Sequence, residues 1–158
     1  MNILSIDSGV ERTGFCIFHL ENSEAVYVTS GLIKTSKTEP IEVRLKKIYI
    51  GIKKILDGQK ISRIVLEQLF FFKNQKTVIS VSQAQGVILL LAAQNNIPVE
   101  FLTPLQIKQS ITGYGKADKK SVQKMLSFFL KLDRTFSQDD EADAVACGLA
   151  YCFRNRQS

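Results

Sequence analysis

Short apolar runs and longer helical patterns follow one another along the chain. The residues at 3–6 form a brief apolar run, and the runs at 15–18 and 25–33 are rich in β-branched and aromatic residues, which favour strands. Short polar turns join these three runs, so the pattern predicts an antiparallel meander. Two further apolar runs, at 62–66 and 98–102, predict two more strands.

Helical periodicity fills much of the rest of the chain. Apolar residues recur every three or four positions in four segments, 40–58, 77–94, 118–130 and 144–151. Thr103 to Gln106 matches a capping box with proline at the first helical position, which predicts a further short helix that ends at Gly113. The predicted order is three strands, helix, strand, helix, strand and three helices. It indicates an α/β protein, with helices flanking a five-stranded mixed sheet whose first three strands are antiparallel, and a single domain over 1–158.

Composition narrows the class of protein. The chain has 158 residues, of which 45% are hydrophobic and 23% charged, values typical of a globular domain. Its apolar runs fall short of the ~20 residues that a membrane span requires, and Met1 leads directly into the first strand without a signal-peptide pattern. Three cysteines, an odd number without Cys-x-x-Cys spacing, predict buried free thiols and a reducing, cytoplasmic location. A net charge of +6 favours polyanionic partners.

Carboxylates stand where buried strands are predicted to end. Asp7 follows the first apolar run and Glu67 follows the run at 62–66, although buried strands rarely carry acids. Asp140 and Asp143 lie three residues apart at the start of the last helix, so they share one helix face. Simpler roles exist, because Asp beside Gly is common in turns and acids favour a first helical turn. Asp143, however, borders an apolar helix, where an acid is costly unless it is paired or metal-bound.

Three carboxylate sites on separate elements can hold two hard cations. Oxygen ligands suit Mg²⁺ or Mn²⁺, and a pair of such ions can act on the attacking and leaving oxygens of a phosphodiester. Zinc is disfavoured because the chain has one histidine, His19, and scattered cysteines. His19 lies in a predicted strand and is interpreted as structural, and it has no partner spacing for a Ser-His-Asp triad.

Basic and aromatic residues gather in two other segments. The segment 108–124 contains five lysines and one acid, Asp118, beside a glycine-rich loop and a helix start, which suits phosphate contact. A solvated surface is the simpler explanation of those lysines. Phe70, Phe71 and Phe72 are consecutive, so they cannot all face one core, and at least one of them is expected at the surface.

A series of motifs covers nearly the whole chain. In order they are Ile6-Asp7-Ser8-Gly9 with Thr13-Gly14, Leu66-Glu67-Gln68-Leu69-Phe70 with Lys73-Asn74, Gln83-Ala84-Gln85-Gly86, Pro104 to Lys108, Gly113 to Lys119, and Asp140-Glu141-Ala142-Asp143-Ala144. Each motif alone is weak evidence, but the ordered set resembles the RuvC family of Holliday-junction resolvases. The resemblance implies an RNase H-like fold, a homodimer, and cleavage of four-way DNA junctions by paired symmetric nicks during recombination and repair. It also implies two Mg²⁺ ions, for which Mn²⁺ could substitute, and branch-migration proteins as partners.

The resemblance assigns roles to particular residues. The catalytic and metal-binding acids would be Asp7, Glu67, Asp140 and Asp143. The DNA-binding residues would be Phe70, Lys73, Lys108, Lys116 and Lys119, with the phenylalanine stacking on a junction base and Lys108 and Lys119 near the scissile strand. Ser8 departs from the family, whose members usually carry proline there. Asp139 stands beside Asp140, so Asp139 is an alternative candidate for the metal ligand assigned to Asp140.

Three other functions are compatible with parts of the pattern. A nuclease of the same fold could cut flapped or forked DNA with less selectivity. A catalytically inactive junction-binding module would gain nothing from four acids, because a polyanion repels them. An ATP-binding domain of the sugar-kinase type shares an Asp-x-Gly strand end, but the chain is too short to supply its second lobe.

Overall fold

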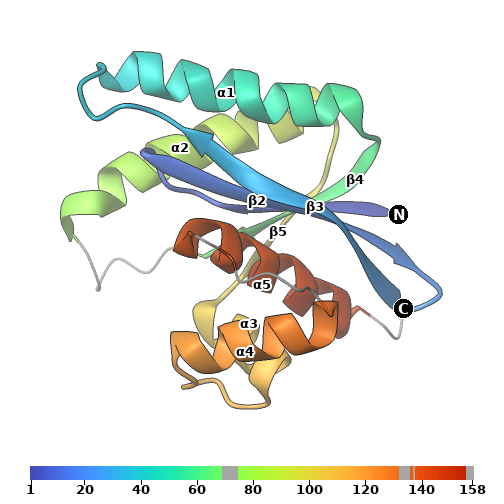
Figure 1. Cartoon of the computed structure of the whole chain (residues 1–158). Coiled ribbons are helices and arrows are strands. Elements are labelled where there is room, and N and C mark those ends of the chain that lie inside the picture. Colours follow the sequence, from blue (N-terminus) through green and yellow to red (C-terminus); the bar gives the residue numbers. More distant parts are fainter. Residues whose placement is uncertain (69–74, 132–135, 137, 156–158) are drawn as a thin grey trace.

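The computed structural model describes residues 1–68, 75–131, 136 and 138–155, and its elements follow the predicted order (Figure 1). The strands are Asn2–Asp7 (β1), Arg12–Glu21 (β2), Glu24–Lys34 (β3), Ile61–Glu67 (β4) and Val99–Leu102 (β5). The helices are Ile41–Gly58 (α1), Gln75–Gln94 (α2), Pro104–Thr112 (α3), Lys119–Leu130 (α4) and Asp139–Arg154 (α5). No helix in these described segments is both long and apolar enough to span a bilayer.

The element ends differ from the predictions by a few residues, for local reasons. β2 begins at Arg12 rather than 15, because Thr13 and Gly14 already pair with β3. Pro40 precedes the first turn of α1 instead of lying inside it. Asp118 caps α4 rather than starting it, since its carboxylate accepts a hydrogen bond from the Ser121 N–H at 2.8 Å.

The capping box predicted at the start of α3 is present. The Thr103 side chain accepts from the Gln106 N–H at 3.1 Å, and the Gln106 side chain accepts from the Thr103 N–H at 2.8 Å. The helix ends at Gly113, which has a φ of 76° and therefore occupies the left-handed region that favours glycine. Both ends of this short helix are thus set by local sequence.

The five strands form one mixed sheet in the order β3-β2-β1-β4-β5. β1 and β2 are antiparallel, as are β2 and β3, whereas β4 runs parallel to both β1 and β5. Ile6 of β1 pairs with Leu66 of β4. The residues that follow this pair, Asp7 and Glu67, therefore lie next to each other at the carboxyl edge of the sheet.

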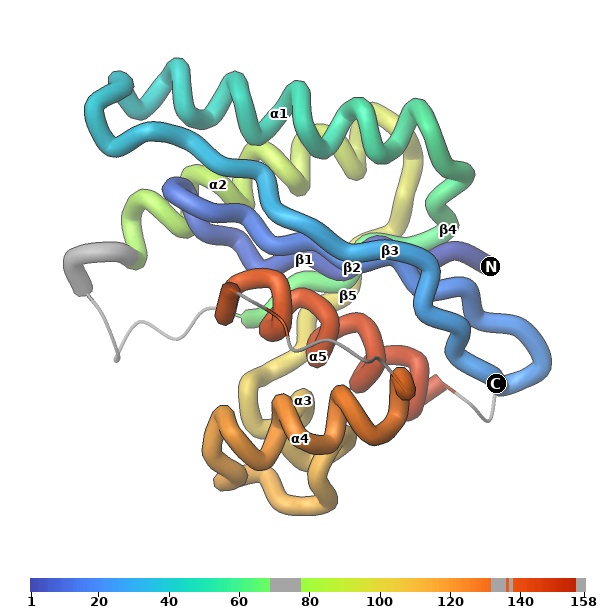
Figure 2. The backbone as a smooth tube through the Cα atoms, in the orientation of Figure 1, coloured from blue at the N-terminus to red at the C-terminus, as the bar shows by residue number. Residues whose placement is uncertain are grey.

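Helices cover both faces of the sheet (Figures 1 and 2). α1 and α2 lie on one face, over a core that includes Leu4, Ile6 and Ile64. α3, α4 and α5 lie on the other face, over a core that includes Ile3 and Phe18. Neighbouring side chains of β1 alternate between these two cores, so both faces of the strand are buried, which explains why Ile3, Leu4 and Ile6 are all apolar.

α5 lies closest to the sheet, and small residues make this possible. A Cβ atom on Gly148 would lie 2.4 Å from the Ser5 hydroxyl and 2.8 Å from the Phe18 ring, so glycine allows the close approach. The Ser5 hydroxyl in turn donates to the Ala144 carbonyl at 2.7 Å. These contacts join the helix to β1, the strand that ends in Asp7.

The predicted burial of the cysteines is confirmed. Cys16, Cys147 and Cys152 are buried in the core, and burial raises the pKa of the Cys16 and Cys147 thiols. His19 lies in β2, where its Nδ1 is 2.7 Å from the Asn2 side-chain oxygen. It pairs with Asn2 at the start of β1, at the opposite end of that strand from Asp7.

Candidate active site

Two adjacent strands deliver the first two acids. Asp7 ends β1, and the following turn is held by the Thr13 hydroxyl, which donates to the Gly9 carbonyl at 2.6 Å. Glu67 ends β4, and its backbone carbonyl accepts from the buried Gln85 amide of α2 at 2.9 Å. A side chain of β2 thus holds the turn after Asp7, and a side chain of α2 holds the backbone at Glu67. These contacts fix the backbone at the two strand ends and so position the two carboxylates.

The start of α5 brings the remaining acids to the same edge. Gly14 pairs directly with Asp7 across the β1–β2 ladder. A Cβ atom on Gly14 would lie 1.9 Å from the Asp140 carbonyl oxygen, so the first turn of α5 packs against this glycine. The acids of three elements thereby meet, although they are far apart in sequence.

The four acids in the first turns of α5 have separate environments. Asp140 is largely buried, with 23% of its side chain exposed, whereas the Asp139 side chain is 67% exposed. Asp143 shares the face of Asp140, as their spacing predicts. Glu141 is buried and accepts a hydrogen bond from the Ser30 hydroxyl of β3, so it belongs to the core side of the helix.

Asp7 is the electrostatic centre of the group. Its pKa is raised from the ordinary value of 3.8 to about 8. Burial is the largest cause, and the negative charges of Asp143, Glu67 and Asp140 contribute in that order. Burial also raises the pKa of Asp143. The carboxylates that raise the pKa of Asp7 therefore include Asp140, one of the predicted metal ligands.

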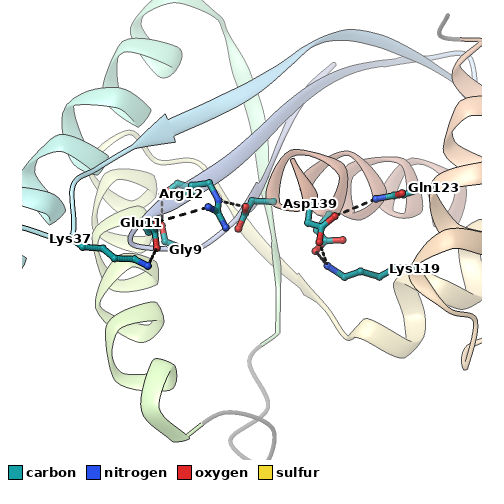
Figure 3. Close-up of polar contacts among 10 residues, drawn as sticks. Gly9, Glu11, Arg12, Lys37, Lys119, Gln123 and Asp139 are labelled. Carbon is teal, nitrogen blue, oxygen red and sulfur yellow. Dashed lines mark hydrogen bonds and ion pairs between the residues drawn. The ribbon is translucent and has the colours of Figure 1, made fainter. Parts of the chain in front are cut away.

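Two cationic side chains offset part of the negative charge of the acids (Figure 3). Arg12, at the start of β2, donates from its Nε to the Asp140 Oδ2 at 2.6 Å. Lys119, at the start of α4, lies 3.1 Å from the Asp143 carboxylate and 3.4 Å from that of Asp139. Both cations therefore reach the first turns of α5, from different elements.

A cavity of about 240 Å³ opens beside the acids. Its polar lining includes Glu67, Asp143, Lys108 and Lys119, and its apolar lining comes from α3, α4 and α5. This cavity is thus bordered by two of the lysines predicted to contact phosphate and by two of the predicted metal ligands. A cavity lined by groups of both charges suits a phosphodiester. The lysines could hold the phosphate, and cations bound to the acids could approach it.

The remaining predicted DNA-binding residues are placed differently. Lys116 is exposed between α3 and α4, outside the lining of the cavity. Phe70 and Lys73, together with Phe71 and Phe72, lie outside the described residues, so their predicted contacts stay predictions.

The chemistry of the donor set suits Mg²⁺. Carboxylate oxygens are the ligands that Mg²⁺ and Mn²⁺ prefer. Within the described segments, no three His, Cys, Asp or Glu side chains are grouped as ligands of one ion. A divalent cation would relieve the repulsion around Asp7, so these residues fit the group that the sequence implies.

Two residues of this region were missed by the sequence analysis. Arg12 received no role, because an arginine after a turn gives no sign of a partner 128 residues later. Ser8 was noted only as a departure from the family pattern. Its hydroxyl is buried and has no hydrogen-bond partner among the described residues.

The mixed sheet and the acids at its carboxyl edge define the class of metal-dependent nucleases with an RNase H-like fold. A sequence profile described as "Crossover junction endodeoxyribonuclease RuvC" matches residues 3–152. The chain belongs to this RuvC family. The RuvC protein of Fusobacterium nucleatum is 47% identical over 146 residues, which cover 92% of this chain and 77% of that protein. That of Pseudothermotoga lettingae is 41% identical over 152 residues, covering 96% and 94%.

Solved structures agree with this assignment. The Thermus thermophilus RuvC structure superimposes with a TM-score of 0.90 at 28% identity, covering 99% of this chain and 96% of that one. T. thermophilus RuvC in complex with a Holliday junction substrate gives a TM-score of 0.91 at 27% identity, with the same coverage. The predicted α/β, RNase H-like fold and the predicted family are confirmed.

Proposed function

We propose that this protein resolves Holliday junctions by making paired, symmetric, metal-dependent nicks. The observation that carries the proposal is the proximity of Asp7, Glu67, Asp140 and Asp143 at one edge of the sheet, where the other three charges raise the pKa of Asp7. Such a group of carboxylates favours cation binding and disfavours a bare DNA backbone. The family of the chain and the junction complex of its T. thermophilus relative support the substrate.

The four acids share the proposed metal site. Asp7, at the centre of the group, would hold the cations together with Glu67, Asp140 and Asp143. When bound, Mg²⁺ or Mn²⁺ would supply an activated water and stabilise the leaving oxygen. The products would be a 5′-phosphate and a 3′-hydroxyl.

The lysines at the cavity complete the proposed chemistry. Lys108 and Lys119 line the hollow next to Glu67 and Asp143, where they can offset charge that develops on the scissile phosphate. Lys119 is engaged with Asp143 at 3.1 Å, so phosphate binding would exchange one anionic partner for another. Phe70, Lys73 and Lys116 are proposed to contact the junction outside this hollow.

We infer that the working unit is a homodimer, because paired nicks require two sites. α2 supports this inference with a stripe of exposed residues on the side away from its buried residues. The stripe consists of Ile79, Gln83, Gly86 and Leu90, spaced by three and four positions. Ile79 is 71% and Leu90 55% exposed, and Gly86 leaves room for close approach of a partner helix.

The proposal extends to the location and the protein partners of the chain. The three buried cysteines favour a reducing cytoplasmic location. Branch-migration proteins are expected partners because resolution must follow movement of the junction.

The decisive experiment uses purified protein and a labelled synthetic four-way junction with Mg²⁺, Mn²⁺ or EDTA. Forked, flapped and linear duplexes run alongside. Paired nicks at symmetric positions, only on the junction and only with metal, support the proposal. Equal cutting of flaps would instead identify a nuclease of relaxed specificity, and junction binding without nicking in either metal would identify an inactive binding module.

A variant separates chemistry from DNA binding. Asp7→Asn keeps the shape of the side chain but removes the central carboxylate, so nicking should fall by several orders of magnitude while junction binding in EDTA persists. The exposed neighbour Asp139, changed to Asn, is the matched control and should keep most of the nicking activity. Equal loss of binding and nicking in Asp7→Asn would contradict the assignment.

A further inference from the structure

The positively charged side chain of Arg12 contacts Asp140, one of the proposed metal ligands. Its Nε donates to the Asp140 Oδ2 at 2.6 Å, a short charge-assisted hydrogen bond. The Asp140 side chain is 23% exposed and that of Arg12 is 42% exposed. The contact therefore lies at the rim of the acid group, with one partner inside the site and the other reaching out to solvent.

The local structure holds Arg12 in this position. Arg12 begins β2 and pairs with Lys34 of β3, while the preceding turn is closed by Thr13. On its outer side the guanidinium lies 3.9 Å from Glu11, and Glu11 lies 3.0 Å from Lys37 (Figure 3). The backbone and the second carboxylate therefore hold Arg12 in reach of Asp140.

The chemistry of the two groups sets up a competition. A guanidinium stays charged at every pH at which a protein is folded, so this positive charge cannot be removed by losing a proton. A divalent cation bound to the same carboxylate would be repelled by it and would compete with it for the oxygen atoms. Among the described residues that contact the proposed ligands, Lys119 is split between Asp139 and Asp143, whereas Arg12 binds Asp140 through one short bond.

We propose that Arg12 is a positioning residue that occupies Asp140 before metal arrives and thereby weakens divalent-cation binding to the site. This inference rests on the proposed function, because it takes Asp140 as a metal ligand. The bond to Arg12 keeps the carboxylate oriented and its charge compensated while no cation is bound. Metal binding then requires Asp140 to exchange or share its partner.

The test measures metal binding directly and uses no DNA. Mn²⁺ is titrated into the full-length protein, and free Mn²⁺ is followed by its electron paramagnetic resonance signal. Arg12→Gln should bind Mn²⁺ about three- to tenfold more tightly than the unchanged protein. Arg12→Lys, which keeps the charge but loses the guanidinium geometry, should show a smaller gain.

Lys37→Gln is the matched control. It also removes one positive charge from the same network, but Lys37 contacts Glu11 and not Asp140. It should change Mn²⁺ affinity by less than about twofold. A gain equal to that of Arg12→Gln would overturn the proposal, since it would reflect net charge rather than the contact. Unchanged or weaker Mn²⁺ binding by Arg12→Gln would overturn it too.

Asp7→Asn distinguishes failure of this inference from failure of the proposed function. If Mn²⁺ binding is weakened by Asp7→Asn but not strengthened by Arg12→Gln, the metal site stands and the role of Arg12 is wrong. If the unchanged protein binds no Mn²⁺, or Asp7→Asn leaves binding intact, the metal site and the inference fail together. Thermal unfolding of each variant verifies that the comparison is between folded proteins.

Discussion

Asp7 makes the stability of the protein depend on pH. Its pKa is about 8 in the folded chain, against an ordinary value of 3.8, so the folded state holds a proton that the unfolded state has lost. The stabilisation is complete below about pH 4 and disappears as the pH rises towards 8. The full shift corresponds to a free energy on the order of 5 kcal/mol. Without metal, the ionised site therefore opposes folding at neutral and alkaline pH.

Asp7→Asn tests this dependence. The variant should be more stable than the unchanged protein at pH 8 in EDTA, and the difference should shrink towards pH 5. Urea denaturation at several pH values measures it, and Asp139→Asn, with its exposed side chain, should show almost none of the effect. A less stable Asp7→Asn protein at pH 8 would mean that the carboxylate is better compensated than its burial and neighbours indicate.

Ser8 and Ser5 are buried serines with opposite hydrogen-bonding states. The Ser5 hydroxyl donates to the Ala144 carbonyl at 2.7 Å, whereas that of Ser8 has no partner among the described residues. Ser8→Ala should therefore raise the free energy of unfolding by about 1 kcal/mol, and Ser5→Ala should lower it by a similar amount. Chemical denaturation of both variants checks this, and destabilisation by Ser8→Ala would reveal a partner for its hydroxyl.

At the scale of the elements, the approach of α5 to the sheet places Asp140 and Asp143. Gly148 is one point of contact, because a Cβ atom there would lie 2.4 Å from the Ser5 hydroxyl. Gly148→Ala should cost about 1–3 kcal/mol of stability and lower the nicking rate, since the helix must shift away from β1. Measurements of unfolding and of junction cleavage test both effects.

Gly58 provides the control for that substitution. It ends α1, and a Cβ atom there would meet nothing within 4 Å. Gly58→Ala should be neutral or stabilising by up to about 1 kcal/mol, because alanine favours the helix more than glycine does. Equal effects of the two substitutions would show that α5 tolerates displacement from the sheet.

At the scale of the whole molecule, the exposed stripe on α2 is the proposed dimer surface. Leu90→Glu places a charge in this stripe and should convert a dimer into a monomer, with loss of paired nicking. Val26→Glu is the control, because Val26 of β3 is 54% exposed against 55% for Leu90 but lies on another element. Sedimentation velocity over a range of concentrations measures the outcome. A monomeric unchanged protein would contradict the dimer proposal.

Much of the architecture was determined by the sequence itself. Short apolar runs predicted the strands in order, and apolar periodicity predicted every helix except α3, because burial on one helix face imposes a repeat of about 3.6 residues. Asp7 and Glu67 could be singled out because an acid directly after a buried run is unusual. The capping box at Thr103 was predicted correctly, since its hydrogen bonds join residues only three positions apart.

Tertiary structure alone decided how the acids differ from one another. Four acids in five consecutive positions look alike in sequence, but only the packing of α5 on Gly14 turns Asp140 inward and leaves Asp139 exposed. The bond between Arg12 and Asp140, and the raised pKa of Asp7, arise from the same packing. They depend on distances and burial between residues far apart in the chain, and no local pattern records those quantities.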